Sequence, residues 1–254
     1  MSLKWLKYSF KRQVLGTAPS LYWGARRLVR GFVEPEIGLL RHVCHPDQLT
    51  LDIGANWGAY AYVASKFSGK VHCFEPQPGL ARVLQRGVGR SANVVVHNVA
   101  VSNASGWAEM RIPRNDIGYS TIEPENRLEE KADLSKGIAV VRVMTQRLDE
   151  LALSRVGFVK IDVEGHEIEV LQGGLELLAR DKPSLIVEVE ERHRRGSVGV
   201  VKGLLGELGY GSFVLELGKL VPTSGLAAGG REHGSRNLVF LHPQAQRGLP
   251  AALF

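Results

Sequence analysis

Short apolar runs alternate along the chain with longer stretches in which apolar residues recur at helical spacing. Most of the runs end in a turn that contains glycine, proline or charged residues. This alternation is typical of buried strands that are connected by helices. We predict strands over residues 49–54, 70–75, 93–100, 157–163 and 184–190.

Two of the later segments show a helical period clearly. Residues 198–208, "VGVVKGLLGEL", predict a helix that ends near Gly209. Residues 167–180 predict another single helix with one buried stripe. The stripe is formed by Ile168, Leu171, Leu175 and Leu178.

Strands that alternate with helices predict an α/β fold, with a mostly parallel sheet that carries helices on both faces. The segments 210–217 and 236–242 predict an antiparallel pair that closes this sheet. We expect a helical N-terminal extension over residues 1–45, the main domain over residues 46–245 and a C-terminal tail over residues 246–254.

One segment interrupts the alternation. Residues 101–139 contain a predicted strand, "GWAEMRI", followed by "GYSTI" and a highly charged stretch. Because the segment lies between the third and fourth predicted strands, it could fold over a site at the sheet edge. Ordinary variation of a solvated loop explains its charged half equally well.

Each predicted strand carries a polar side chain at or near its carboxyl end. These side chains belong to Asp52, Glu75, Asn98, Asp162 and Glu188. The carboxyl ends of parallel strands meet at one edge of the sheet, where ligands of such folds bind. We therefore expect a ligand site there.

The charge distribution singles out the N-terminus. The net charge of +6 is mild, but residues 1–33 contain seven lysines and arginines and no acid before Glu34, with aromatic residues between them. A basic, aromatic helix can lie on a membrane surface, so peripheral membrane contact through residues 1–33 is one interpretation. Packing of its apolar face on the domain is the other.

The remaining composition indicates an ordinary globular chain of 254 residues, 44% hydrophobic and 23% charged. The two cysteines, Cys44 and Cys73, form no CxxC pair, which fits free thiols in a reducing, cytoplasmic compartment. No apolar run approaches the roughly 20 residues that span a bilayer, and no second ligand pair supports a zinc site at "RHVCHPD".

The turn "LDIGANWG" limits the choice of ligand. A dinucleotide fingerprint requires G-x-G-x-x-G, but Asn56 and Ala59 occupy two of the glycine positions counted from Gly54. A side chain at position 56 crowds a pyrophosphate. Asp52 can accept a hydrogen bond from an ammonium group, and Glu75 can accept from two ribose hydroxyls. This combination favours S-adenosylmethionine, which carries both groups and no phosphate.

Six motifs occur along the chain in the order in which one known protein family has them. They are "DIGANWGAY" (52–60), "FEP" (74–76), "NVAVSNASG" (98–106), "TQRLDEL" (145–151), "VKIDVEGHEIEVLQGG" (159–174) and "PSLIVEVE" (183–190). With them the sequence resembles the FkbM-type family of S-adenosylmethionine-dependent methyltransferases over about residues 36–242. The resemblance implies a class I methyltransferase (Rossmann-like) fold and methyl transfer to a hydroxyl oxygen of a sugar, glycan or natural-product acceptor.

The resemblance also implies roles for individual residues. Glu75 would hold the ribose, and Asn98 and Ala100 would flank the adenine. The methionine part would be held by Asp52, Gly54, Asn56 and Gly58.

Three residues near the predicted strand ends are candidates for the chemistry. Asp162 is expected to be the principal catalytic or acceptor-orienting residue, His166 the general base and Glu188 a supporting carboxylate. A histidine suits the base because its ordinary pKa lies near 6.5. As an alternative, Asp162 and Glu188 could hold a magnesium ion that lowers the pKa of the acceptor hydroxyl.

Other functions stay open at this point. A catalytically silent module could bind S-adenosylmethionine without turnover, and a nicotinamide-dependent oxidoreductase would need the missing glycines. Methyl transfer to nitrogen is not favoured, because the sequence lacks an Asn-Pro-Pro-Tyr-like motif of the enzymes that methylate amino groups. A nucleic-acid substrate is not expected, because the basic residues near the site are not interleaved with aromatic residues. The run from Arg192 to Arg195, "RHRR", suggests an anionic acceptor group.

Overall fold

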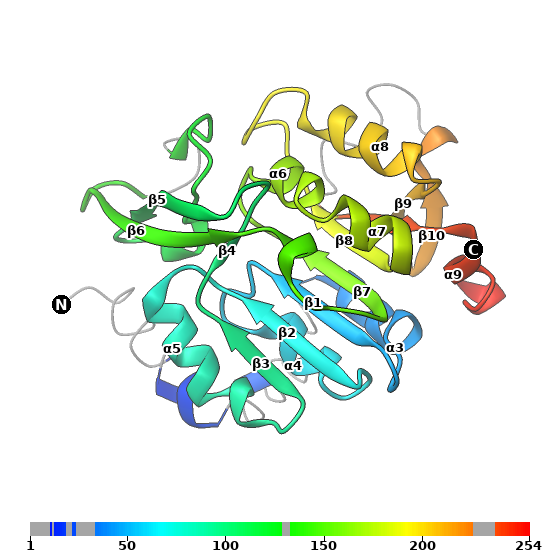
Figure 1. The fold of residues 1–254 in the computed structure, drawn as a ribbon, viewed down its shortest axis with the longest axis horizontal. Coiled ribbons are helices and arrows are strands. Elements are labelled where there is room, and N and C mark those ends of the chain that lie inside the picture. Colours follow the sequence, from blue (N-terminus) through cyan, green and yellow to red (C-terminus); the bar gives the residue numbers. More distant parts are fainter. Residues whose placement is uncertain (1–10, 12, 19–21, 24–33, 129–132, 226–236) are drawn as a thin grey trace.

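The structure, a computed structural model, describes residues 11, 13–18, 22–23, 34–128, 133–225 and 237–254 (Figure 1). Most of the N-terminal segment for which we predicted membrane contact lies outside these residues. The described part begins with helical residues between 11 and 17 and continues with the 3₁₀ helix η1 (Pro35–Leu39) and helix α3 (Leu40–Val43). None of the described helices has the length and hydropathy needed to cross a bilayer.

The centre of the molecule is one eight-stranded sheet with the order β10-β9-β11-β8-β7-β1-β2-β3. Its parallel half contains β1 (Leu49–Ile53), β2 (Lys70–Phe74), β3 (Val94–His97), β7 (Val156–Ile161) and β8 (Ser184–Glu188). These strands confirm the predicted α/β architecture, with boundaries shifted by a few residues.

The other end of the sheet is antiparallel. It consists of β9 (Gly211–Glu216), β10 (Lys219–Pro222) and β11 (Asn237–Leu241). The predicted pair formed by β9 and β11 is confirmed, and β11 also pairs with β8. The last strand of the chain is therefore an internal strand of the sheet, and all five of its residues are buried.

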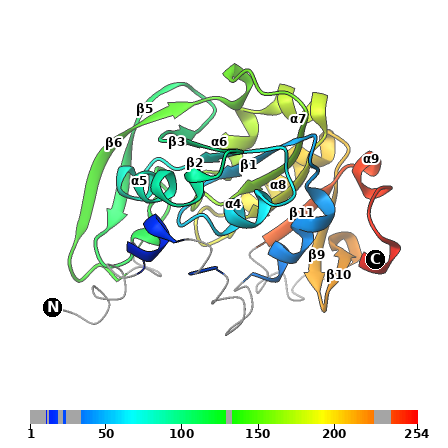
Figure 2. The same ribbon diagram turned by 90° about the horizontal axis from the view of Figure 1, so that it is seen from below.

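Helices cover both faces of the sheet (Figures 1 and 2). Helices α4 (Ala59–Ala64) and α5 (Pro78–Arg86) pack on one face, where their apolar residues join Val71, Cys73 and Ile186. Helices α6 (Glu167–Gln172), α7 (Leu175–Asp181) and α8 (Ser197–Glu207) pack on the other face, against Leu51 and Val187. Successive residues of a strand point to opposite faces of the sheet and therefore pack into two different cores. The chain ends with α9 (Pro243–Gln246) and the short helix η7 (Ala251–Leu253).

The single helix predicted over residues 167–180 is wrong, because the chain breaks it into α6 and α7 at Gly173 and Gly174. The backbone oxygen of Ser102 would lie 2.0 Å from a Cβ at Gly173, and Leu148 Cδ1 would lie 2.9 Å from one at Gly174. The neighbouring segment fills the space that a continuous helix would need for side chains. Of the predicted stripe, Ile168, Leu171 and Leu178 belong to one core, whereas Leu175 is 37% exposed, so the stripe was wrong at that position.

A second, three-stranded sheet forms the interrupting segment. Its order is β4-β6-β5, with β4 (Ala100–Val101), β5 (Gly106–Pro113) and β6 (Ile138–Gln146). The strand predicted over residues 93–100 is therefore divided between the two sheets, and β6 was not predicted. Short helices η3 (Ile117–Tyr119) and η5 (Leu148–Glu150) follow β5 and β6, while η2 (Val88–Arg90) and η6 (Thr223–Gly225) lie elsewhere in the fold.

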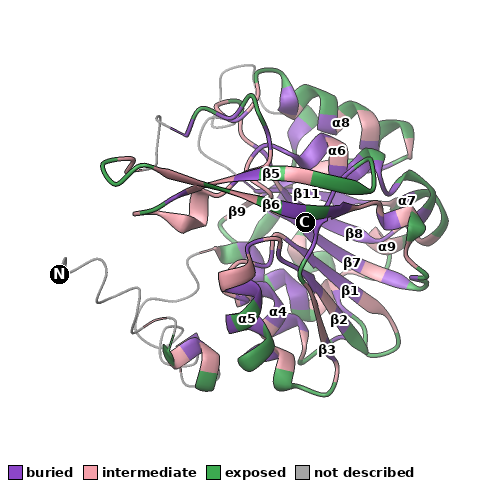
Figure 3. Cartoon of the chain, turned by 60° about the vertical axis from the view of Figure 1, so that its left-hand side comes forward, coloured by how far each residue is buried: buried purple, intermediate pink, exposed green. Residues whose placement is uncertain are grey.

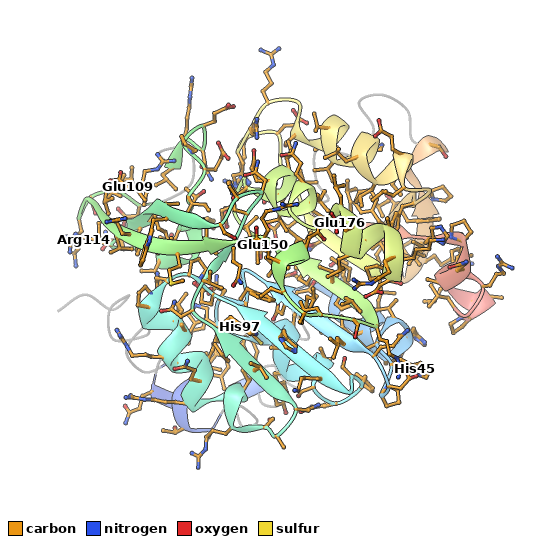
Figure 4. The ribbon with its side chains drawn as sticks, in the orientation of Figure 1. His45, His97, Glu109, Arg114, Glu150 and Glu176 are labelled. Carbon is orange, nitrogen blue, oxygen red and sulfur yellow. The ribbon has the colours of Figure 1, made fainter. Side chains whose placement is uncertain are left out.

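The outer face of the second sheet is open to solvent, which Figure 3 shows in green on β5, whereas the main sheet is largely buried. Trp107 is 61% exposed there. Glu109 and Arg114, labelled in Figure 4, lie at the periphery of the molecule. The inner face instead packs Met110 and Val143 toward the carboxyl ends of the parallel strands. The second sheet thus forms one wall of a cavity at that edge.

Candidate functional site

The turn after β1 has a conformation that glycine makes possible. Gly54 has a φ of +78°, and a Cβ at this position would lie 1.7 Å from the backbone oxygen of Asp162. The N–H of Asp162 also donates to the carbonyl of Ile53 at 3.0 Å. The ends of β1 and β7 therefore come into contact at Gly54. Glycine is required at this position because the two backbones leave no room for a side chain.

Gly58 serves the helix that follows rather than a cavity. It is the residue before α4, with a φ of +79°, and a Cβ there would lie 2.7 Å from Leu84 Cδ2. It does not line either of the two cavities described below. Its predicted contact with the cofactor stays a prediction.

Asp52 is fixed beneath the same turn. Its side chain accepts a hydrogen bond from the N–H of Ala61 at 2.9 Å, and the residue is 2% exposed. Burial raises the pKa of this carboxyl to about 7, opposed by the charge of Lys160 and the Ala61 N–H, and the carboxylate of Glu34 raises it further. The group is thus held where a cationic partner would favour its charged form.

Glu75 follows β2 and is held by two backbone groups. Its Oε2 accepts from the N–H of Asn56 and its Oε1 from the N–H of Gln77, each at 2.8 Å. Burial raises the pKa of Glu75 to about 7, while these two hydrogen bonds lower it. A carboxylate oxygen can accept more than one hydrogen bond, so each oxygen keeps acceptor capacity toward a ligand.

Asn98 has a supporting position. Its side-chain amide donates to the carbonyls of Glu75 and Pro76, both at 2.9 Å. It is absent from the cavity lining, whereas Val99 and Ala100 are part of it. Asn98 therefore stabilises the backbone conformation at Glu75 and Pro76.

A first cavity lies at this edge of the sheet, with a volume of about 570 Å³ that includes the open solvent at its mouth. It extends from Gly54 and Glu75 across Ala100 and Met110 to His166. Its lining contains the carboxyl groups of Glu75, Asp162 and Glu164, and no described lining residue is a lysine or arginine. A pyrophosphate would find no cationic side chain in this lining, whereas a ligand with hydroxyl groups and a positive charge suits it.

A second cavity of about 810 Å³ lies beside the first and is also open to solvent. The two share Gly54, Asn56 and Asp162. Asp52 lines only the second. The predicted cofactor residues thus separate into one group around Glu75 and another around Asp52.

Asp162 is half-buried and lies at the boundary of the two cavities. Burial raises its pKa well above the ordinary value, and the Glu188 carboxylate raises it further, while Lys160 lowers it. Lys160 is 1% exposed and donates to Asn237 Oδ1 at 2.8 Å. Glu188 lines neither cavity, so it acts on Asp162 through its charge.

His166 lines the first cavity, and both of its ring nitrogens have partners. Nε2 lies 2.9 Å from Ser102 Oγ, and Nδ1 lies 3.2 Å from Glu123 Oε2 and 3.6 Å from Glu169 Oε2. Action as a base therefore requires one of these contacts to open. Neither Ser102 nor Glu123 stood out in the sequence, because the second sheet and the segment after it bring them to the histidine.

The same histidine belongs to a group with the chemistry of metal ligands. Among the described residues, Glu123, His166 and Glu169 are the three whose ligand atoms lie within 4.8 Å of one another. Arg194 donates to the other oxygen of Glu169 at 2.7 Å. The magnesium pair considered from the sequence, Asp162 and Glu188, has no third such ligand in the described part of the chain.

The basic run after β8 is largely matched by acidic residues. Arg192 pairs with Glu190, and His193 lies 2.9 Å from Glu164. Arg194 pairs with Glu169. The expectation of an anionic acceptor rested on the arginine side chains at this edge of the sheet and stays a prediction; in the structure the guanidinium groups of Arg192 and Arg194 pair with carboxylates of the chain itself.

Residues 52–212 match the Methyltransferase FkbM domain family. The 2-O-methyltransferase NoeI of Sinorhizobium fredii is 28% identical over 187 residues, which are 66% of this chain and 76% of NoeI. The hexuronic acid methyltransferase AglP of Haloferax volcanii is 27% identical over 139 residues, which are 54% of each protein.

A solved structure also resembles the fold. The FkbM methyltransferase from Methylobacillus flagellatus shares 15% sequence identity, with a TM-score of 0.49. The similarity covers 78% of this chain and 44% of the other chain.

Proposed function

Because this chain belongs to the FkbM methyltransferase family, we propose that it transfers the methyl group of S-adenosylmethionine to a hydroxyl oxygen of a sugar, glycan or natural-product acceptor. The name of NoeI specifies transfer to oxygen, and the name of AglP specifies a hexuronic acid. These relatives support an oxygen acceptor on a sugar-like molecule.

S-adenosylmethionine is the cofactor, and the residues of the site fit it. Glu75 offers acceptor capacity to a ribose, and carboxyl groups without lysine or arginine line the first cavity, which suits a sulfonium and not a phosphate. When bound, the cofactor supplies an activated methyl group. The protein then has to position the acceptor and accept its proton.

The carboxyl of Asp162 is the observation that carries the proposal. It lies where both cavities meet, at the end of the central strand β7. A carboxyl group at this place can orient a hydroxyl by hydrogen bonding. We assign Asp162 the role of orienting the acceptor hydroxyl.

His166 is the proposed general base. For Nε2 to receive a proton, the hydroxyl of Ser102 has to turn aside. Glu123 and Glu169 lie on the Nδ1 side and favour an imidazolium ring once the proton has been taken. Glu188 supports the site through its negative charge beside Asp162.

The test is methyl transfer from isotopically labelled S-adenosylmethionine to a panel of glycans and hydroxylated small molecules, read by mass spectrometry. Asp162→Asn nearly preserves the shape and removes the charge, so we expect a kcat lowered by about 10²-fold or more, with cofactor affinity retained. Asp47→Asn is the matched control, because Asp47 precedes β1 and lies at the opposite edge of the sheet. Nearly full turnover by Asp162→Asn would contradict the assignment.

A further inference from the structure

The second cavity is partly built by residues that precede the span matched by the family. Lys11, Trp23 and Glu34 line it, and the matched span begins at residue 52. Opposite them lie Asp52, the turn at Gly54 and Asn56, and the end of β7 at Asp162. Lys11, Trp23 and Glu34 therefore line a chamber, open to solvent, whose opposite side is the predicted cofactor turn.

Three carboxyl groups, those of Glu34, Asp52 and Asp162, meet in this chamber with one buried ammonium group, that of Lys160. The carboxyl groups outnumber this buried ammonium group by three to one. Glu34 is held in place because its Oε2 accepts from the hydroxyl of Tyr60 at 2.8 Å and from Asn237 Nδ2 at 3.3 Å. The charge of Glu34 adds to the pKa elevation that burial causes at Asp52 and Asp162. A positively charged ligand group would relieve this repulsion.

Two further groups in the chamber have unsatisfied hydrogen-bonding capacity. Trp23 is 7% exposed, and its Nε1 has no hydrogen-bond partner among the described residues. Asn56 Oδ1 is likewise buried and without a partner in the described part of the chain. Because buried polar groups are normally hydrogen-bonded, an unpaired donor and an unpaired acceptor on one cavity indicate a polar ligand.

The charges and the unpaired groups are complementary to a zwitterion. An ammonium suits Glu34, Asp52 and Asn56 Oδ1, and a carboxylate suits the indole N–H of Trp23. Lys11 adds positive charge on this side, where its Nζ lies 4.3 Å from the ring centroid of Trp57. The first cavity provides the ribose acceptor Glu75 and the adenine-flanking Ala100, and it joins the second at Gly54 and Asn56.

We propose that the second cavity holds the amino-acid end of S-adenosylmethionine, with Glu34 accepting from its ammonium and Trp23 donating to its carboxylate. The inference rests on the proposed function, because it needs this cofactor as the ligand. It assigns cofactor binding to residues of the N-terminal segment, for which the family motifs predict nothing.

The test compares two ligands that differ at the amino-acid end. S-adenosylhomocysteine has this end, whereas 5′-methylthioadenosine lacks it, and both are uncharged at sulfur. Calorimetry should show that Glu34→Gln lowers the affinity for S-adenosylhomocysteine by about tenfold or more, because a charge-assisted hydrogen bond is lost. Trp23→Phe keeps an aromatic side chain and removes the indole N–H, and should weaken binding of S-adenosylhomocysteine by about three- to tenfold. Neither variant should change the affinity for 5′-methylthioadenosine.

Matched controls separate this role from general effects. Glu207→Gln and Trp107→Phe make the same chemical changes at exposed positions on α8 and β5, and should leave both affinities unchanged. Glu75→Gln should weaken both ligands, because both contain the ribose. Equal weakening of the two ligands by Glu34→Gln would overturn the inference, since it would indicate a structural role.

Three other outcomes are equally decisive. If Glu34→Gln and Trp23→Phe lower methyl transfer and leave S-adenosylhomocysteine affinity unchanged, the chamber belongs to the acceptor and the inference is wrong. If the unsubstituted protein binds neither ligand, the proposed function itself fails. Binding of both ligands by the unsubstituted protein, with no effect of the two substitutions, overturns the inference alone.

Discussion

Substitution of Gly54 by alanine tests whether the contact between β1 and β7 holds the site together. The new Cβ would lie 1.7 Å from the backbone oxygen of Asp162, and real Cβ contacts are not shorter than about 3.0 Å. The end of β7 would therefore have to move by about 1.3 Å. Such a movement disrupts the hydrogen bond from Asp162 N–H to the Ile53 carbonyl.

The expected cost follows from these parts. A φ of +78° costs an alanine about 1–2 kcal/mol, and loss of the hydrogen bond costs about 0.5–1.5 kcal/mol. Residual crowding adds to both, so we expect Gly54→Ala to lower the free energy of unfolding by about 2–4 kcal/mol. Because Gly54 lines both cavities, distortion of its turn should also weaken binding of S-adenosylhomocysteine by at least about tenfold.

Gly196→Ala is the matched control. Gly196 has a φ of +80°, and no described atom lies within 4 Å of the position of its Cβ. This variant should show the backbone cost alone, about 1–2 kcal/mol, with full cofactor affinity. Urea unfolding gives the two free energies and calorimetry gives the two affinities. Equal destabilisation by the two variants would refute the close approach as the reason for Gly54.

Three further predictions concern the chemistry and the buried acids. His166→Ala should lower kcat by about 10²-fold and remove an inflection of the rate between about pH 6 and 8, whereas a pH profile that keeps the inflection would exclude this base. EDTA should have little effect on turnover, and complete loss of activity would assign a metal to the mechanism. Asp52 and Glu75 have a pKa of about 7 in the folded chain against ordinary values of 3.8 and 4.5. Between these values the unfolded chain binds fewer protons than the folded chain. The free energy of unfolding of the free protein, measured with urea, should therefore fall from about pH 4 to about pH 7. The fall should be less steep in the double variant Asp52→Asn, Glu75→Gln, which lacks both carboxyl groups.

The sequence predicted the parallel half of the fold because that half is locally encoded. Strands such as β1 and β8 are short, mainly apolar segments with an acidic residue at or next to their end, and this pattern does not depend on distant contacts. The break between α6 and α7 depends on the backbone of Ser102 approaching Gly173, a contact 71 positions away in the chain. A single-sequence pattern does not contain that information.

The site shows the same division. Asp52, Glu75 and Asp162 could be predicted because each follows a strand that ends at the common edge of the sheet. Glu34 could not, because its place beside them is set by hydrogen bonds to Tyr60 and Asn237, at a separation of 203 positions in the second case. Burial of Lys160 beside these acids is likewise visible only in the folded chain.

The internal position of β11 sets the order in which the sheet can be completed during synthesis. A ribosome makes β8 and β9 before residues 237–241, and these two strands are joined in the sheet only through β11. Until β11 emerges, each has an edge with unpaired backbone groups, and such edges can pair with neighbouring chains. Closure also joins β11 to strands made earlier, a non-local step that is slow in folding. The nascent chain is thus most exposed to aggregation just before its last strand is available.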